Sequence, residues 1–218
     1  MARLTTQPAN LTVDMRHHEQ ALEHSGIWPV AGADEAGRGA CAGPLVIASV
    51  ILPPPSQPLP KALLGIADSK LLTAQKREAL FDQINQYALA VAVICVDVEE
   101  VDANGVHAAN IAGMRRALLA LAPAPQYVLT DGYAIAGVGI PGLAVWKGDR
   151  VSAAIAAASI IAKVTRDRIM VSLDAQFPEY GFAKHKGYIT RAHEAALLEH
   201  RPSVVHRRSF ANIAALLG

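Results

Sequence analysis

Hydrophobic residues occur along this chain in short runs separated by polar and glycine-rich segments, a pattern typical of alternating strands and helices. Residues 27–33 form one apolar run, and residues 44–52 form a second that is almost wholly apolar. A glycine-rich turn separates the two runs, so we expect them to be paired neighbouring strands. Further strands are predicted over residues 127–130 and 143–146, and a buried strand over residues 89–98.

Helical patterns occupy the segments between these strands. Thr73 is placed to cap a helix over residues 73–87, and residues 101–121 indicate a second helix despite Gly105. A long helix, alanine-rich in its first half, is predicted over residues 152–177. Two hairpin-like strands followed by alternating helices and strands predict an α/β fold with a mixed β-sheet flanked by helices.

The two ends of the chain differ from this central pattern. Residues 1–25 are polar without a period and predict a flexible tail, which leaves residues 26–218 as a single domain. Residues 178–218 contain no strand pattern and predict a helical extension packed on the sheet. The proline-rich segment 53–60 is expected to be an irregular surface excursion, because the fifty or so residues before it are too few for an independent core.

Composition narrows the class of protein. The chain has 218 residues, of which 52% are hydrophobic, ample for a core. Cys41 and Cys95 are far apart and lack metal-ligand spacing, so no disulfide framework or zinc site is predicted and a cytoplasmic setting is expected. The N-terminus lacks the apolar run of a secretory signal, and the apolar stretches 89–96 and 153–162 are shorter than the ~20 residues that span a bilayer. No membrane association is expected.

Charge is divided unevenly along the chain although the net charge is only +1. Residues 1–162 hold 11 Lys or Arg and 14 Asp or Glu, whereas residues 163–218 hold 9 and 5. This division suits a polyanionic substrate if the acidic part holds cations and the basic part holds phosphates. A chance fluctuation in a neutral enzyme is the alternative.

Carboxylates follow three of the predicted strands: Asp34 with Glu35, then Asp131, then Asp149. If these strand ends lie at one edge of the sheet, four acids converge. Oxygen-only ligands suit Mg²⁺ or Mn²⁺, and two such ions ~4 Å apart support in-line phosphoryl displacement. Like charges at close range repel, which predicts a raised pKa for at least one acid in the metal-free state.

Local geometry limits how these acids are presented. Asp34 and Glu35 cannot both enter one site from a regular strand, so one is predicted to lie on a kink. Asp131 precedes Gly132 and is also an ordinary turn residue. Asp149 stands just before the long helix, where a capping aspartate is common.

Three further segments are candidates for contacts with nucleic acid. Gly37 and Gly39 permit close backbone approach and Arg38 suits phosphate, although a solvated loop is the alternative. On a helix Ser159, Lys163 and Arg166 share one face, which presents a hydroxyl and two cations to a phosphate backbone unless it is only a solvated face. Residues 180–188 interleave cations with aromatic side chains, as stacking on sugars or bases requires, although each residue alone is more often structural.

Together these motifs resemble ribonuclease HII, the enzyme family that cuts at ribonucleotides in hybrid or mixed duplexes. Residues 32–43 resemble its first signature, and Asp131-Gly132 and Lys147-Gly148-Asp149 resemble its second and third acidic signatures in the same order. Residues 156–167 are similar to its longest signature. Lesser matches are Asp68-Ser69-Lys70, His185-Lys186-Gly187-Tyr188 and the closing His206-Arg207-Arg208-Ser209-Phe210.

The resemblance implies an RNase H-like fold and a monomer that acts on RNA/DNA hybrids or on DNA duplexes containing ribonucleotides. It implies cleavage on the 5′ side of a ribonucleotide, with 3′-hydroxyl and 5′-phosphate ends. The four acids would hold two Mn²⁺ or Mg²⁺ ions. Backbone groups of residues 37–39 would contact the 2′-hydroxyl, and Tyr188 would pack on the deoxyribose that follows. The remaining candidate substrate contacts are Lys70, Ser159, Lys163, Arg166, His185, Lys186 and Arg207, the last of which either holds phosphates or braces the fold.

The sequence departs from the family pattern at three places, none a proposed ligand. Ala40-Cys41 stands where Pro-Leu is usual, Tyr133 where asparagine is frequent, and Gly105-Val106 where a helix often begins Asn-Ile. Ribonuclease HIII is a rival reading, but it carries an extra N-terminal DNA-binding domain for which 25 residues leave no room. Other rivals are an RNase H-fold exonuclease or resolvase, and a nucleic-acid-binding module without catalysis.

Overall fold

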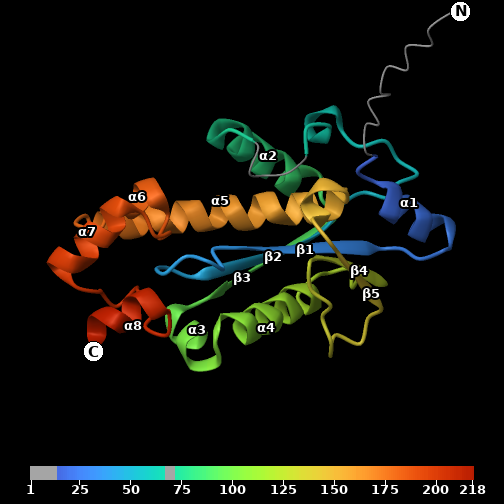
Figure 1. The fold of residues 1–218 in the computed structure, drawn as a ribbon. Helices are drawn as coiled ribbons and strands as arrows, with labels where there is room; N and C mark the ends of the chain where they lie inside the picture. Colours follow the sequence, from blue (N-terminus) through green and yellow to red (C-terminus); the bar gives the residue numbers. More distant parts are fainter. Residues whose placement is uncertain (1–13, 67–71) are drawn as a thin grey trace, which may run out of the picture.

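The computed structural model describes residues 14–66 and 72–218. In this part of the chain five strands form one sheet in the order β3-β2-β1-β4-β5, and the long helix α5 and helix α4 lie on opposite sides of it (Figure 1). The strands are β1 (Val30–Ala36), β2 (Leu45–Ile51), β3 (Ala90–Val96), β4 (Tyr127–Asp131) and β5 (Gly142–Val145). The helices and 3₁₀ turns are α1 (His17–His24), η1 (Lys61–Leu63), α2 (Ala74–Tyr87), α3 (Val98–Asn104), α4 (Val106–Leu119), η2 (Gly148–Arg150), α5 (Ala153–Gln176), α6 (Phe182–His185), α7 (Arg191–His200) and α8 (Ala211–Leu217).

The sheet is mixed, as the sequence predicts. β1 and β2 are antiparallel, with Gly32 opposite Val50, so the expected hairpin is confirmed. β1 is parallel to β4, and β4 is parallel to β5. Because β1 and β4 run in the same direction, the carboxyl ends of both strands lie at the same edge of the sheet.

Helix α5 packs closely on β1 because both surfaces are made of small residues. Its alanine-rich first half is buried throughout. At Gly32 of β1, an added Cβ would lie only 2.1 Å from the backbone carbon of Ala154, so only glycine permits this approach. Ser152 caps the helix by accepting a hydrogen bond from the backbone N–H of Ile155. The long helix and its start at Ser152 are therefore confirmed.

Two predicted elements differ in the structure. The segment predicted as one helix over residues 101–121 consists of α3 and α4, which meet at Gly105. Gly105 has φ of 77°, a left-handed conformation that interrupts a right-handed helix. Strand β3 lies at the edge of the sheet and is only partly buried, whereas a buried strand was expected. Among the described residues β3 pairs with β2 alone, so its outer side has no neighbouring strand.

The N-terminal segment also differs from the expected flexible tail over residues 1–25. Residues 17–24 form helix α1, and within it Glu19 is buried. The Glu19 carboxylate accepts hydrogen bonds from the Ser152 hydroxyl at 2.8 Å and from the Ala154 N–H at 3.0 Å. The helix therefore ties this segment to the start of α5, which a pattern of polar residues cannot reveal.

The C-terminal helices α6, α7 and α8 lie beyond the end of α5 (Figure 1). Apolar residues from this segment, among them Tyr180, Phe182 and Leu197, form a cluster with Cys41 and with Met170 of α5. The helical extension thus packs on the turn that joins β1 and β2. Across the described residues, none of the helices combines the length and the apolar character needed to cross a membrane.

Candidate active site

The four predicted acids are carried by neighbouring segments at one end of the sheet. Asp34 lies in β1 with 5% of its surface exposed, and it receives a hydrogen bond from the Ser159 hydroxyl of α5. Asp131 is the last residue of β4, the parallel neighbour of β1. The electrostatic influence of Asp131 reaches Asp34, so these two carboxylates face a common region.

The segment that carries Asp149 is joined to Asp131 by a tight turn after β5. Lys147 adopts a left-handed conformation with φ of 52°, and the N–H of Gly148 then donates a 2.7 Å hydrogen bond to Asp131 Oδ1. Asp149 follows directly and is buried. Asp131 therefore bridges β4 and η2, and Ser152, not Asp149, caps α5.

Asp34 and Glu35 both lie within a regular strand, so the prediction that one of them occupies a kink is wrong. They pair with Ala48 and Ile47 of β2, and β1 continues to Ala36. The strand extends past its apolar residues because β2 offers an unbroken line of pairing partners. The two side chains consequently start from opposite faces of the sheet, yet the charge of Glu35 still acts on Asp34, so a regular strand does not keep the two carboxylates apart.

Electrostatics at this end of the sheet are unfavourable to ionised acids. The pKa of Asp34 lies well above its ordinary value, first because the carboxyl is buried and second because Glu35 is near. The charge of Asp131 raises it further, while the hydrogen bond from Ser159 lowers it. The predicted raised pKa is therefore confirmed for Asp34.

Carboxylate oxygens are the donors that hard divalent cations prefer, and a cation would relieve this repulsion. The acids do not by themselves form a complete set of ligands around one ion. Within residues 14–66 and 72–218, no three His, Cys, Asp or Glu residues are close enough together to hold one metal ion. The donor chemistry fits Mg²⁺ or Mn²⁺, and the ligand set stays a prediction.

The turn formed by residues 37–39 is built around a buried arginine. Gly37 has φ of 90°, and an added Cβ would lie 1.8 Å from Arg166 Nε, so both conformation and space demand glycine. At Gly39 an added Cβ would meet no atom within 4 Å, so this backbone is open to a ligand. The guanidinium of Arg38 lies 4.8 Å from the ring centroid of Tyr133, two residues beyond Asp131.

Arg166 corrects one prediction. Its side chain has 0% exposure and donates to the backbone carbonyls of Pro44, Ala42 and Lys186. Its guanidinium also lies 5.5 Å from the ring centroid of Tyr188. Arg166 is therefore a structural clamp between the turn of residues 37–39 and Tyr188, and it is not placed to contact phosphate.

The other two residues of the expected helix face, Ser159 and Lys163, also have partners within the protein. Ser159 is committed to Asp34, and Lys163 forms a 2.7 Å ion pair with Asp167. The three side chains share a face of α5, but each meets a different neighbour along it.

Arg207 is also buried and braces the fold. Its Nε donates to the carbonyl of Gly43 at 3.1 Å, and another guanidinium nitrogen donates to the carbonyl of Arg38 at 3.1 Å. Burial, followed by the charge of Arg166, lowers the pKa of Arg207 to about 10. Of the two roles expected for Arg207, the structure supports bracing.

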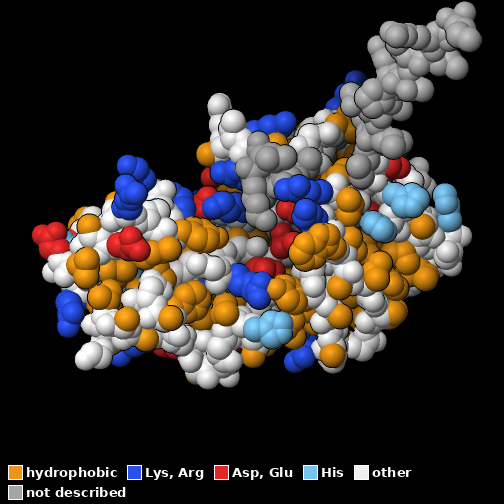
Figure 2. Space-filling view, viewed as in Figure 1, with side chains coloured by type: hydrophobic (Ala, Val, Ile, Leu, Met, Phe, Trp, Pro, Cys, Tyr) orange, Lys and Arg blue, Asp and Glu red, His pale blue; other side chains and the backbone are white. Residues whose placement is uncertain are grey.

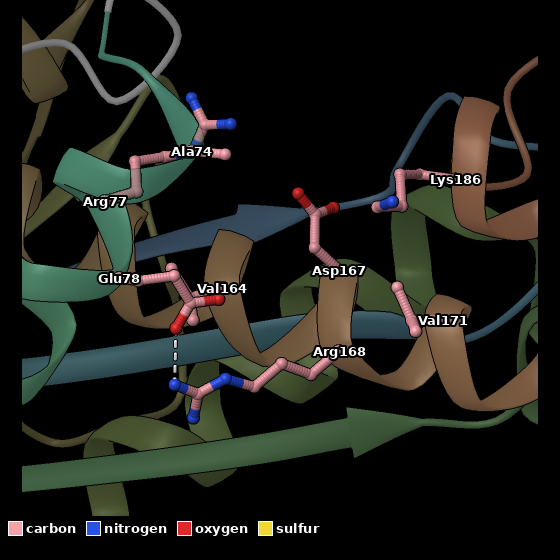
Figure 3. A pocket seen from close by; sticks show the side chains of 8 residues that line it. All are labelled: Ala74, Arg77, Glu78, Val164, Asp167, Arg168, Val171 and Lys186. Atoms are coloured by element: carbon pink, nitrogen blue, oxygen red, sulfur yellow. Dashed lines mark hydrogen bonds and ion pairs between the residues drawn. The ribbon is translucent and has the colours of Figure 1, made fainter.

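The aromatic and basic segment presents one exposed ring. Tyr188 is 40% exposed, whereas His185 bonds the carbonyl of Tyr180 through Nε2 and Lys186 donates to the carbonyl of Ala183. Lys186 also lines a pocket of about 380 Å³ between α2 and α5 (Figure 3). The pocket lining comprises Ala74, Arg77, Glu78, Val164, Asp167, Arg168, Val171 and Lys186.

The four acids are not among those lining residues, so the pocket of Figure 3 is separate from the candidate site. Acidic side chains are visible near the middle of the face in Figure 2, with Lys or Arg side chains beside them. Lys70, a predicted contact within Asp68-Ser69-Lys70, lies outside the described residues.

Three residues near this site have contacts that the sequence does not predict. Tyr133 is a departure from the family pattern, and its ring lies against the guanidinium of Arg38. His193 and His206 are buried and bond each other at 3.1 Å. No local pattern reveals these contacts, because Tyr133 lies far along the chain from Arg38 and the two histidines lie 13 residues apart.

Comparisons with known proteins place these features in a family. A profile described as Ribonuclease HII matches residues 31–213. The ribonuclease HII of Salinispora arenicola is 57% identical over 200 residues, which cover 92% of this chain and 73% of that protein. The range matched by the profile includes the positions of all four acids and of Tyr188.

Solved structures share the fold. The crystal structure of ribonuclease H2 from Pyrococcus horikoshii OT3 superimposes with a TM-score of 0.73 at 28% identity, covering 86% of this chain and 96% of that one. Bst-RNase HIII in complex with Mn²⁺ matches with a TM-score of 0.63 at 20% identity, covering 86% and 68% of the two chains, and supports the fold alone. The predicted RNase H-like fold with C-terminal helices is confirmed.

Proposed function

The chain belongs to the ribonuclease HII family, and from this premise we propose the reaction that its site performs. The protein is a ribonuclease H of type HII and hydrolyses the RNA strand of RNA/DNA hybrids. It also cuts duplex DNA on the 5′ side of an embedded ribonucleotide. The products carry 3′-hydroxyl and 5′-phosphate ends.

The observation that carries this proposal is that Asp34 and Asp131 lie at the same ends of two neighbouring parallel strands, close enough for the charge of Asp131 to act on Asp34. Asp34 and Asp131 influence each other across parallel strands, and the Gly148 N–H holds Asp131 beside the segment that bears Asp149. A buried carboxylate such as that of Asp34, with other carboxylates near it, destabilises the folded protein unless a cation or a proton compensates its charge. In a hydrolase that acts on a phosphodiester, such a cation also takes part in catalysis.

Two divalent ions, Mg²⁺ or Mn²⁺, are proposed as the cofactors, held by Asp34, Glu35, Asp131 and Asp149. When bound, they lower the pKa of the attacking water and stabilise charge on the leaving oxygen. The oxygen donors of these carboxylates support this choice of ion, and Bst-RNase HIII, a protein with the same fold, has been solved in complex with Mn²⁺. The chain itself orients the donors, since Ser159 holds Asp34 and the Gly148 N–H holds Asp131.

Recognition of the ribonucleotide is assigned to the turn of residues 37–39 and to Tyr188. The 2′-hydroxyl distinguishes RNA from DNA at one position, and backbone groups at a glycine turn can approach it closely. The open backbone at Gly39 and the exposed ring of Tyr188 support this assignment. Arg166 contacts both elements, so it fixes the distance between them.

A cleavage assay on a DNA duplex with one embedded ribonucleotide tests the proposal. We expect a single cut on the 5′ side of the ribonucleotide with Mg²⁺ or Mn²⁺, and none with EDTA or with the all-DNA duplex. Cutting of an all-DNA junction would favour a resolvase. Binding without cleavage, by both the wild type and Asp34→Asn in the presence of Mn²⁺, would favour a non-catalytic module.

Metal binding can be tested without any activity measurement. A ligand at 100 times its Kd stabilises the folded state by about 2.7 kcal/mol. We therefore expect Mn²⁺ to raise the melting temperature of the wild type and to have a much smaller effect on Asp34→Asn. An equal shift in both proteins would place the binding ion away from Asp34.

A further inference from the structure

The segment that carries Tyr188 is unusually well held, because all the backbone polar groups of residues 186–188 are hydrogen-bonded. The three N–H groups donate to Phe182 O, His185 Nδ1 and His185 O, in chain order. The three carbonyls accept from Arg166, from the Cys41 N–H and from His193 Nδ1, in the same order. Of these partners, the one that holds the carbonyl of Tyr188 itself is His193, at 3.1 Å.

The protonation of His193 follows from its neighbours. The backbone N–H of Ser203 donates to His206 Nδ1 at 3.0 Å, so the proton of a neutral His206 is on Nε2. That proton is donated to His193 Nε2 at 3.1 Å. His193 therefore carries its own proton on Nδ1, and that proton is the one donated to Tyr188 O.

The surroundings keep both rings neutral and fixed. His193 stacks on His185 with centroids 4.3 Å apart and meets Phe182 edge-on. Burial is the main cause that lowers the pKa of His193, and burial followed by the charge of His193 lowers the pKa of His206 to about 4. At neutral pH the chain of hydrogen bonds from Ser203 to Tyr188 is thus intact.

We propose that His193 is a positioning residue for Tyr188, and that His206 acts through it by fixing its tautomer. The inference rests on the proposed function, in which the ring of Tyr188 packs on the sugar beyond the ribonucleotide. His193 touches neither substrate nor acids. It holds the backbone of Tyr188, so that the exposed ring is presented in one orientation to the duplex.

Two variants of His193 with side chains of the same shape, His193→Asn and His193→Leu, distinguish a hydrogen-bonding role from a packing role. Asn and Leu have the same branching, and both lose the contact with His206, but only His193→Asn keeps a nitrogen donor near the position of Nδ1. We expect His193→Leu to lose about tenfold in kcat/KM on the one-ribonucleotide duplex, and His193→Asn to stay within about threefold of the wild type. Thermal melting of each variant sets an assay temperature at which all are folded.

A double-mutant cycle decides whether the loss passes through Tyr188. In a Tyr188→Ala background the ring is gone, so adding His193→Leu should reduce kcat/KM less than twofold further. An equal tenfold loss in both backgrounds, or equal losses for Asn and Leu, would overturn the proposal. If His193→Leu does not fold, His193→Gln replaces it, because its amide reaches His206 but not Tyr188 O.

The control is the wild-type enzyme on the same duplex. Failure of the wild type to cut would count against the proposed function, whereas normal cutting by a folded His193→Leu variant would count only against the role of His193.

Discussion

Two regions of the molecule differ in how far the chain itself compensates their polar groups. One is the end of the sheet that bears the acids, and the other is the segment that bears Tyr188. At the acidic end, burial and neighbouring charges work against the ionised form of Asp34. In residues 186–188, every backbone group has a partner from the chain itself. The buried cation there, Arg166, donates to three carbonyls.

The difference separates two kinds of functional residue. A ligand site that takes up cations must leave its own charge uncompensated by the chain, which lowers the stability of the metal-free protein. A surface that orients a sugar gains from rigidity, so its hydrogen bonds are completed within the fold. Substitutions at the two regions should therefore change stability in opposite directions.

The largest effect is expected from Asp34→Asn. Loss of a ligand carboxylate should reduce cleavage by about a thousandfold or more, since charge stabilisation supplies much of the rate enhancement. The same substitution should raise the melting temperature without metal at pH 8, by about 2–4 °C for each kcal/mol of repulsion removed. Steady-state cleavage and calorimetry measure the two effects.

The sign follows from the raised pKa of Asp34. The folded protein binds this proton more tightly than the unfolded chain, so the free energy of unfolding falls as pH rises between the ordinary pKa and the raised one. Asn removes that dependence. Glu78→Gln, at an exposed ion pair with Arg168, is the control and should change neither activity nor stability much. A lower melting temperature for Asp34→Asn at pH 8 would contradict the interpretation.

A smaller effect, on stability, is expected from Arg166→Met. The substitution leaves three carbonyls without their donor, so we expect a loss of about 3 kcal/mol in the free energy of unfolding, measured by urea denaturation. Arg168→Met, two residues along the same helix, removes an exposed ion pair with Glu78 and the contact of the guanidinium with the Phe81 ring, and should cost about 1 kcal/mol or less. Equal losses for the two variants would show that Arg166 does not act as a clamp.

The smallest effect concerns the acid sensitivity of the Tyr188 region. Because the pKa of His206 is lowered to about 4, the unfolded chain binds more protons than the folded protein between this value and the ordinary pKa of histidine. Stability should therefore fall as pH falls through that interval, with a contribution from His206 of about 2 kcal/mol. Urea denaturation of the wild type and His206→Gln at several pH values measures this contribution.

Asp34 is present in both the wild type and His206→Gln, so its opposite contribution to the pH dependence of stability cancels. The difference between the two proteins then reports His206. The wild type should lose more stability than His206→Gln between pH 6.5 and pH 4. Parallel pH dependences would mean that His206 does not titrate in the way that its burial against His193 and Tyr180 indicates.

Much of the fold follows from local pattern. The hairpin of β1 and β2, the start of α5 and the order of the acidic motifs could all be predicted, because hydrophobic period and turn residues act over a few positions, whereas the capping residue of α5 is Ser152 and not Asp149. The family resemblance added the fold and the class of reaction. Helix α1 escaped prediction, since its polar sequence is held by contacts with distant segments, from Glu19 to the start of α5 and from Glu23 to Ser56.

The roles of individual side chains at the site depended on contacts between distant segments. Lys163 and Arg166 lie three positions apart on one helix, yet one forms an ion pair at the surface and the other is enclosed by carbonyls from residues 42, 44 and 186. Sequence determines which groups a helix face carries, because the helical period is local. Only the tertiary structure decides which of them meets solvent, since the burial of a charge depends on the partners that other segments bring to it.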